Sequence, residues 1–128
     1  MDGSTSPDVT LERLHEIADA FARRDVDGIV NSFAEDGEFR NAKGPDYWGQ
    51  NFKGKAAIRR YFEPLFANTG DVKWNHTKEF ICDDRAVTEW HRTATLNTGE
   101  RQEWLGCDLY TFRRGLIVMK DTYIKVVA

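Results

Sequence analysis

Residues 104–112, Trp-Leu-Gly-Cys-Asp-Leu-Tyr-Thr-Phe, form the stretch that decides the fold. Its aromatic and apolar residues predict a β-strand, in which successive side chains point to opposite faces. One face then carries Trp104, Gly106, Asp108, Tyr110 and Phe112, and the other carries Leu105, Cys107, Leu109 and Thr111. Both faces are largely apolar, so we expect both to be covered. A carboxylate inside such a strand must be paired or protonated.

Strand-like runs surround this stretch in the second half of the chain. They cover residues 72–82, 85–96, 100–113 and 116–127, and they are separated by Asp83-Asp84, Asn97-Thr98-Gly99 and Arg113-Arg114-Gly115. Short segments rich in Gly, Asn and Asp between strands are typical of turns. Consecutive long strands joined by short turns predict an antiparallel meander.

The first half of the chain has apolar residues at helical spacing instead. The pattern predicts a helix that contains Leu11 to Phe21, a second that Asp25 caps and Asp36-Gly37 ends, and a third over residues 55–68. Pro64 should kink or restart the third helix. Helices first and strands later indicate an α+β fold, with the helices packed on one face of a curved sheet.

Two apolar features remain without a partner in this scheme. A sheet with helices on one side should have one wet face, yet residues 104–112 are apolar on both. We therefore expect a homodimer through the outer face of the sheet. Residues 42–53 form a loop that holds Tyr47, Trp48 and Phe52. These rings either cover a cavity mouth or pack on one another, and the sequence leaves both readings open.

The composition of the chain indicates how many domains it forms and which kinds of partner it lacks. The chain has 128 residues, 41% of them hydrophobic, and a formal net charge of -3. This fits one domain over residues 9–128, preceded by a flexible polar leader over residues 1–8. Without a basic patch or a run long enough to span a bilayer, neither nucleic acid nor a membrane is an expected partner, and the protein is expected to be cytoplasmic.

The cysteines and histidines lack the spacing of metal ligands. Cys82 and Cys107 lie in apolar strand-like runs and are expected to be buried free thiols. His15, His76 and His91 form no pair one helical turn apart. No metal is therefore expected, and because the sequence also has no nucleotide-binding loop, no cofactor is expected.

The first hairpin supplies neighbours for Asp108. A two-residue turn at Thr98-Gly99 pairs Asn97 with Glu100 and sets Glu89 directly opposite Asp108. His91 then falls on the same face, one diagonal step away. A register slip of one residue would move both side chains to the other face.

The second hairpin allows two registers. A two-residue turn at Arg114-Gly115 sets Asp121 opposite Asp108, whereas a three-residue turn sets Lys120 there. Opposite charges across strands are stabilising and like charges are not, so we expect Lys120. Two carboxylates, from Glu89 and Asp108, would then share one ammonium group. One carboxylate kept ionised and the other protonated would offer a base and an acid at neutral pH.

Three segments resemble SnoaL-like proteins of the ketosteroid-isomerase-like, nuclear-transport-factor-like superfamily. They are Phe-Ala-Glu-Asp-Gly-Glu-Phe at 33–39, Gly-Lys-Ala-Ala-Ile-Arg-Arg-Tyr-Phe at 54–62, and Gly-Cys-Asp-Leu-Tyr-Thr-Phe at 106–112 followed by Gly-Leu-Ile at 115–117. The resemblance spans about residues 9–126. It implies a conical fold, with three helices on a curved antiparallel sheet, a pocket at the wide end, and dimers through the outer sheet face.

The resemblance also implies roles for single residues. Asp108 falls on the strand position where ketosteroid isomerase keeps a protonated acid, and Asn41 aligns with the general-base aspartate of that enzyme. Ile17 aligns with its first-helix tyrosine, so steroid isomerisation itself is not expected. Gly106 stands where the epoxide hydrolases of the family have an arginine. The cyclases of the family use a His with an Asp, and His91 and Asp108 match those parts loosely.

Together these features predict a small-molecule pocket protein. The expected chemistry is cofactor-free acid–base catalysis, of isomerase, dehydratase or cyclase type, on a small apolar carbonyl or hydroxyl compound. The expected catalytic residues are Asp108, His91, Glu89 and Lys120, and the expected ligand-binding residues are Asn41, Trp48, Phe62, Trp104, Tyr110 and Thr122. Two alternatives stay open. The pocket could bind a ligand without turnover, or it could be packed shut in a protein whose role is interaction.

Overall fold

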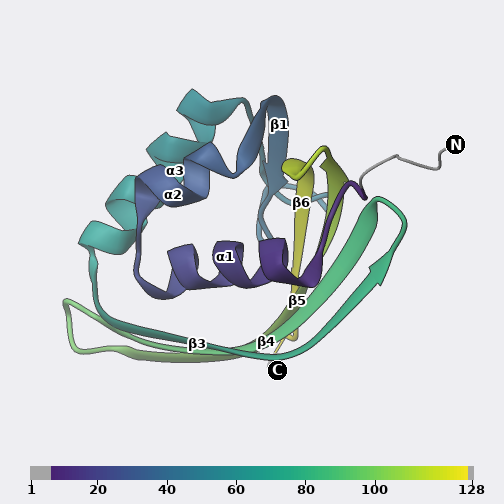
Figure 1. Ribbon diagram of the computed structural model, residues 1–128. Helices are drawn as coiled ribbons and strands as arrows, with labels where there is room; N and C mark the ends of the chain where they lie inside the picture. The colour runs from purple at the N-terminus through teal and green to yellow at the C-terminus, as the bar shows by residue number, and fades with distance from the viewer. Residues whose placement is uncertain (1–6, 127–128) are drawn as a thin grey trace, which may run out of the picture.

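A computed structural model describes residues 7–126 and places three helices against a six-stranded sheet. The elements in chain order are α1 (Leu11–Ala22), α2 (Val26–Asn31), β1 (Phe33–Arg40), β2 (Asn51–Lys53), α3 (Lys55–Ala67), β3 (Thr69–Cys82), β4 (Arg85–Leu96), β5 (Arg101–Arg113) and β6 (Leu116–Ile124). The strand order is β2-β1-β6-β5-β4-β3. Figure 1 shows α1 lying across the concave side of the sheet, with α2 and α3 beside it. The predicted α+β fold is confirmed.

Side chains cap the starts of α1 and α2, and Asp25 does so as predicted. The Thr10 hydroxyl accepts a hydrogen bond from the Arg13 N–H at the start of α1, and the Asp25 carboxylate accepts one from the Gly28 N–H at the start of α2. Side chains of all three helices join one apolar core on the concave side of the sheet. Its most deeply buried large members are Phe33, Phe112, Leu14, Ile17, Ile29, Ile58 and Ile117.

The meander of β3, β4, β5 and β6 is antiparallel, as predicted. The prediction that the second helix extends to Asp36-Gly37 is wrong, because β1 already begins at Phe33 and pairs in parallel with β6. Gly37 permits this close approach, since a Cβ there would lie 2.7 Å from the backbone oxygen of Ile117. The sheet is therefore mostly, not wholly, antiparallel.

Two further expectations about the first half need correction. Pro64 lies inside α3, which continues through it to Ala67. The loop predicted over residues 42–53 ends in β2, which pairs with β1. Trp48 is 62% exposed, and its ring contacts Tyr47 and the Arg40 guanidinium, so it lies on the surface rather than over a cavity.

The predicted leader over residues 1–8 falls mostly on residues 1–6, which lie outside the described part of the chain. Asp8 is described and is tied to the turn between β5 and β6. Its backbone oxygen accepts from the Gly115 N–H at 2.7 Å, and its carboxylate accepts from the Arg114 N–H at 2.8 Å. Of the two cysteines, Cys82 is exposed and Cys107 is half-buried, so the expectation of two buried thiols is wrong.

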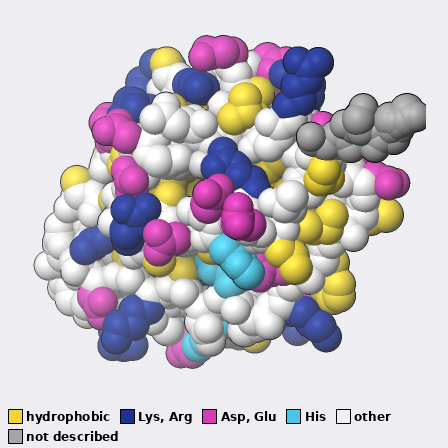
Figure 2. All heavy atoms as spheres, in the orientation of Figure 1, with side chains coloured by type: hydrophobic (Ala, Val, Ile, Leu, Met, Phe, Trp, Pro, Cys, Tyr) yellow, Lys and Arg dark blue, Asp and Glu magenta, His cyan; other side chains and the backbone are white. Residues whose placement is uncertain are grey.

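The surface carries charges of both signs. Acidic and basic side chains are interspersed over the face seen in Figure 2, without a broad patch of either sign. Among the described residues, no helix is long and apolar enough to span a membrane. Within residues 7–126, no three His, Cys, Asp or Glu side chains gather as the ligands of a metal ion would.

Candidate functional site

The turn between β4 and β5 sets the neighbours of Asp108. Leu96 and Glu100 close the turn through a 2.8 Å hydrogen bond, so three residues lie between them, and Gly99 takes the left-handed φ of 91°. The predicted two-residue turn is therefore wrong by one residue. Thr88, not Glu89, lies opposite Asp108. Because side chains alternate, this single step exchanges the two faces of β4.

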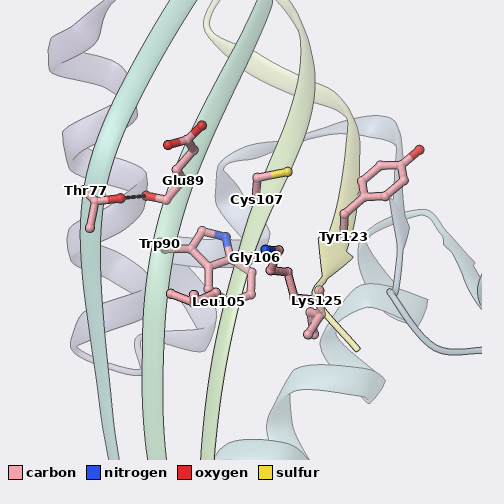
Figure 3. A pocket seen from close by; sticks show the side chains of 9 residues that line it. Thr77, Glu89, Trp90, Leu105, Gly106, Cys107, Tyr123 and Lys125 are labelled. Atoms are coloured by element: carbon pink, nitrogen blue, oxygen red, sulfur yellow. Dashed lines mark hydrogen bonds between the residues drawn. The ribbon is translucent and has the colours of Figure 1, made fainter. Parts of the chain in front are cut away.

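Glu89 and His91 consequently lie on the outer face of the sheet, away from Asp108. Figure 3 shows Glu89 on the wall of a shallow outer hollow, beside Thr77 and across from Cys107. The Nε2 atom of His91 lies 2.7 Å from Oε2 of Glu103, also on this outer face. The structure does not bring either predicted acid–base residue to the aspartate.

The turn between β5 and β6 has two residues and is followed by a bulge. Arg114 and Gly115 have φ values of 52° and 79°, as a type I′ turn requires. The register then shifts by one residue after Phe112, so that Thr122 lies opposite Asp108 and Lys120 lies opposite Tyr110. The prediction that Lys120 lies directly opposite the aspartate is wrong. Lys120 nevertheless shares the inner face with Asp108, one diagonal step away.

A buried polar cluster surrounds the aspartate. Lys120 Nζ lies 2.8 Å from Asp108 Oδ1 and 2.9 Å from Thr122 Oγ1, and the Thr122 hydroxyl donates to the same carboxylate oxygen at 2.6 Å. The indole N–H of Trp90 donates to Oδ2 at 2.9 Å. Asp108 and Lys120 are each only 4% exposed. Such a pair is tolerated in the interior because both charges are hydrogen-bonded.

Gly106 explains how Trp90 reaches the aspartate. The two residues are cross-strand partners, and a Cβ at Gly106 would lie 2.5 Å from the Trp90 ring. The Trp90 ring therefore occupies the space that the side chain of any other residue at position 106 would fill. In the sequence Gly106-Cys107-Asp108, the glycine thus leaves room for the Trp90 ring, and the aspartate accepts the hydrogen bond from its indole N–H.

A cavity of about 80 Å³ lies between this cluster and the helices. Apolar and aromatic side chains dominate its wall, with the polar groups of Asn41, Tyr61, Arg92, Lys120 and Thr122 among them. Its lining residues are Phe21, Phe39, Asn41, Tyr61, Phe62, Leu65, Trp74, Trp90, Arg92, Trp104, Lys120, Thr122 and Ile124. Of the site residues named from the sequence, Asn41, Phe62, Trp104, Thr122 and Lys120 line this cavity. Tyr110, Trp48 and Asp108 are not among the lining residues.

The comparisons with known proteins agree with this geometry. A family model described as the SnoaL-like domain matches residues 14–119. The chain belongs to the SnoaL-like family. No curated protein sequence matches it.

Solved structures with the same fold share little sequence with this SnoaL-like chain. An NTF2-like protein of unknown function from Burkholderia pseudomallei has a TM-score of 0.79 at 17% identity, over 94% of this chain and 92% of that one. TerC, co-crystallised with polyporic acid, has a TM-score of 0.78 at 20% identity, with 94% and 92% covered. An LEH-like epoxide hydrolase from M. tuberculosis has a TM-score of 0.75 at 12% identity, with 90% and 81% covered. The NTF2-like fold is thereby confirmed.

Three hydrogen-bond donors in the cavity of this SnoaL-like chain were missed by the sequence analysis. Arg92 is 3% exposed. The Trp74 indole nitrogen is buried without a partner among the described residues. The hydroxyl of Tyr61 is the third, and burial raises its pKa, so it stays protonated at neutral pH. The missed signal was the alternation in β4, where Ala86, Trp90 and Ala94 mark the buried face that also carries Arg92.

A larger groove at the surface adjoins the cavity. The groove has a volume of about 490 Å³ and shares Trp104 and Ile124 with the cavity. The Trp104 ring lies between two cations, with the Arg92 guanidinium carbon 4.6 Å and the Lys43 ammonium 5.2 Å from its centre. Trp104 therefore lines both the inner cavity of this SnoaL-like domain and the outer groove.

Proposed function

We propose that this SnoaL-like protein binds a small carbonyl or hydroxyl compound in the inner cavity and catalyses a cofactor-free proton transfer on it. The observation that carries the proposal is the position of Lys120. Its ammonium group is buried, is held by Asp108 and Thr122, and borders the cavity. A fixed cation in a largely apolar cavity stabilises negative charge on a substrate oxygen better than water does.

The polar groups of the cavity favour particular reaction types. Lys120, Arg92 and Tyr61 are donors, and no Asp or Glu is among the lining residues within the described chain. The site therefore suits steps in which a substrate oxygen gains electrons. In an enolisation, Lys120 hydrogen-bonds the carbonyl oxygen as the carbon-bound proton leaves to water. In a dehydration, the carbon-bound proton leaves to solvent as the C=C bond forms and the C–O bond breaks, Lys120 gives its proton to the departing hydroxyl, which leaves as water, and solvent restores the ammonium group.

Asp108 acts through Lys120 in this scheme. Its two oxygens accept hydrogen bonds from Lys120, Thr122 and Trp90, which cover it. It is thus a positioning residue that keeps the ammonium charged and aimed, rather than the acid or base expected from the sequence. Glu89 and His91 have no part in the scheme, because their side chains lie on the outer face.

Proton exchange in heavy water tests the proposal without a known product. Wild-type protein is incubated in D2O with a panel of aryl ketones and β-hydroxy ketones, and proton NMR follows deuterium at the α-carbon and loss of water. We expect faster exchange than in buffer for members of the panel. Lys120→Met should slow it by roughly 100-fold. Lys73→Met, on the exposed face of β3, is the matched control and should leave the rate unchanged.

A non-catalytic binding role is the second candidate, and the chemistry of the cavity wall favours it. No Asp or Glu is among the lining residues within the described chain, so no carboxylate is placed to take a proton from the ligand. In this role the ligand is held but not turned over. Saturable binding of panel members, together with exchange rates no faster than in buffer, would support this candidate over the enzyme.

The expected homodimer stays a proposal, and so does the cytoplasmic location. Leu105 and Tyr123, 55% and 54% exposed, lie on the outer sheet face beside the hollow in Figure 3. Neighbouring exposed apolar groups on one face support association through it. Analytical ultracentrifugation tests the dimer, and a monomer at all concentrations would contradict it.

A further inference from the structure

Arg92 is a buried cation without a carboxylate partner. Among the described residues, no Asp or Glu oxygen forms a salt bridge with it, and its one side-chain hydrogen bond is from Nη1 to Gln102 Oε1 at 3.2 Å. A guanidinium group carries five N–H donors. Burying a charge is costly unless it is paired, and burial lowers the pKa of this guanidinium. The folded chain thus leaves most of the bonding capacity of Arg92 unused.

Two indole rings fix the position of this guanidinium. Trp74, Arg92 and Trp104 are cross-strand neighbours on β3, β4 and β5. The guanidinium carbon lies 5.3 Å from the Trp74 ring centre and 4.6 Å from the Trp104 ring centre. Rings stacked on a guanidinium leave its edge free for a planar acceptor. The rigid flanks also reduce the entropy lost when a ligand is bound.

The surrounding wall carries a positive charge that nothing in the described chain balances. Asp108 neutralises Lys120, so the charge of Arg92 remains. The unpartnered indole nitrogen of Trp74 and the protonated hydroxyl of Tyr61 belong to the same wall. All of these groups donate hydrogen bonds. A ligand that matches them presents acceptor oxygens and a negative charge.

We propose that Arg92 is the binding residue for a carboxylate, and that the ligand of this protein is a small carboxylic acid with a flat apolar body. A carboxylate presents two acceptor oxygens in one plane, which matches the donor fork of the guanidinium. The inner cavity has room for the charged end of such a molecule. The flat body extends past Trp104 into the groove that shares this residue.

This inference names the ligand class of the site, and it rests on the proposed function for the cavity in which the ligand lies. An experiment can contradict the proposed catalysis without contradicting the proposed carboxylate ligand, and the reverse. Proton exchange depends on Lys120, whereas preference for a carboxylate over its neutral counterpart depends on Arg92. Binding without exchange would overturn the proposed enzyme and leave the inference standing.

Calorimetric titration with matched pairs tests the inference. Benzoate, phenylacetate and trans-cinnamate are compared with benzamide, phenylacetamide and cinnamamide at neutral pH. We expect wild type to bind at least one carboxylate roughly 10- to 100-fold more tightly than its amide. Arg92→Met should abolish this preference. Arg60→Met removes an exposed arginine on α3 and should keep it.

Two further variants keep the test decisive. Arg92→Lys retains the charge without the planar fork, so it should fold and show a reduced preference. Lys120→Met should lose proton exchange but keep a preference for carboxylates. Equal binding of acids and amides by wild type, no binding of any carboxylate, or a preference that survives in both Arg92→Met and Arg92→Lys would overturn the inference. Arg92 would then be a packing element between two indole rings.

Discussion

Lys120 and Arg92 are two cations buried to the same degree on the inner face of one sheet, and they differ in their partners. Lys120 has a carboxylate at 2.8 Å and a hydroxyl at 2.9 Å. Arg92 has one amide oxygen at 3.2 Å and two indole rings. Asp108 balances the charge of Lys120 and the pair contributes to stability, whereas the charge of Arg92 is left for a ligand to balance. The comparison therefore predicts that substitution costs much more stability at the Lys120 pair than at Arg92.

Asp108→Asn is expected to have the largest effect, a loss of about 3 kcal/mol in the free energy of unfolding. The amide keeps the shape of the carboxylate but leaves the charge of Lys120 buried without a counterion. Urea denaturation at neutral pH measures the change. Asp121→Asn, on the other face of β6, is the matched control and should change stability by less than about 0.5 kcal/mol.

The opposite result would reverse the roles in the comparison. If Asp108→Asn were as stable as wild type or more so, the carboxylate would be a strained functional group instead of a structural partner. Adding Lys120→Met to the asparagine variant sharpens the test. With neither charge present, much of the lost stability should return, because no unpaired ion remains in the interior.

Gly106→Ala should have the next largest effect, a loss of about 2 kcal/mol from overpacking. The new Cβ would lie 2.5 Å from both the Trp90 ring and the Tyr123 backbone oxygen, so the ring that donates to Asp108 has to move. Thermal and urea denaturation measure the loss. Gly70→Ala is the control, since its Cβ would meet no atom closer than 3.5 Å. Equal losses of stability in the two variants would show that the close contact between Gly106 and the Trp90 ring does not contribute to stability.

Arg92→Met should change the free energy of unfolding by less than about 1 kcal/mol in either direction. The lost contacts with the indole rings are offset by the removal of a buried charge. This small effect, beside the large one at Asp108, is the contrast between the two cations expressed in stability. A loss of stability as large as that of Asp108→Asn would mean that Arg92 is needed for the fold, and that the two cations do not differ in role.

The smallest expected effect concerns pH and His76. Burial lowers the pKa of this imidazole below its usual 6.5, helped by Lys120 and His15 and opposed by Asp108 and Glu79. A histidine whose folded pKa is lowered contributes stability above its unfolded pKa and loses it as the pH falls below that value. His76→Gln should therefore flatten the decline in melting temperature from neutral to mildly acidic pH. An unchanged slope would contradict this.

The strands and helices were predictable because their signals are local. Alternation along residues 104–112, turn residues between the strands and the caps of α1 and α2 each depend on a few neighbours in sequence. The site was less predictable, because register depends on turn length. Asn97-Thr98-Gly99 fits a two-residue or a three-residue turn equally well, and one residue of difference moved Glu89 and His91 to the outer face.

The pattern of apolar residues along β4 indicates which face is buried, and so which register pairs β4 with β5; the turn residues alone do not. Ala86, Trp90 and Ala94 share one face of β4, and Glu89 and His91 lie on the other, which favours the first as the inner face. Arg92 belongs to that inner face. The ion pair of Lys120 with Asp108 was found for a sound reason, the preference for opposite charges, although the register used for it was wrong. A bulge at the Thr111–Phe112 step shifts the pairing of β5 with β6 by one residue. This shift places Lys120 diagonally across from Asp108.

The tryptophans give the cavity an optical signal of its own. Three of the four, Trp74, Trp90 and Trp104, border the cavity, and the fourth, Trp48, is exposed in the loop before β2. In a Trp48→Phe variant, all intrinsic indole emission would come from the cavity wall. Water that enters or leaves this space, or a ligand that displaces Trp104, would then change the colour and intensity of the fluorescence without any added label.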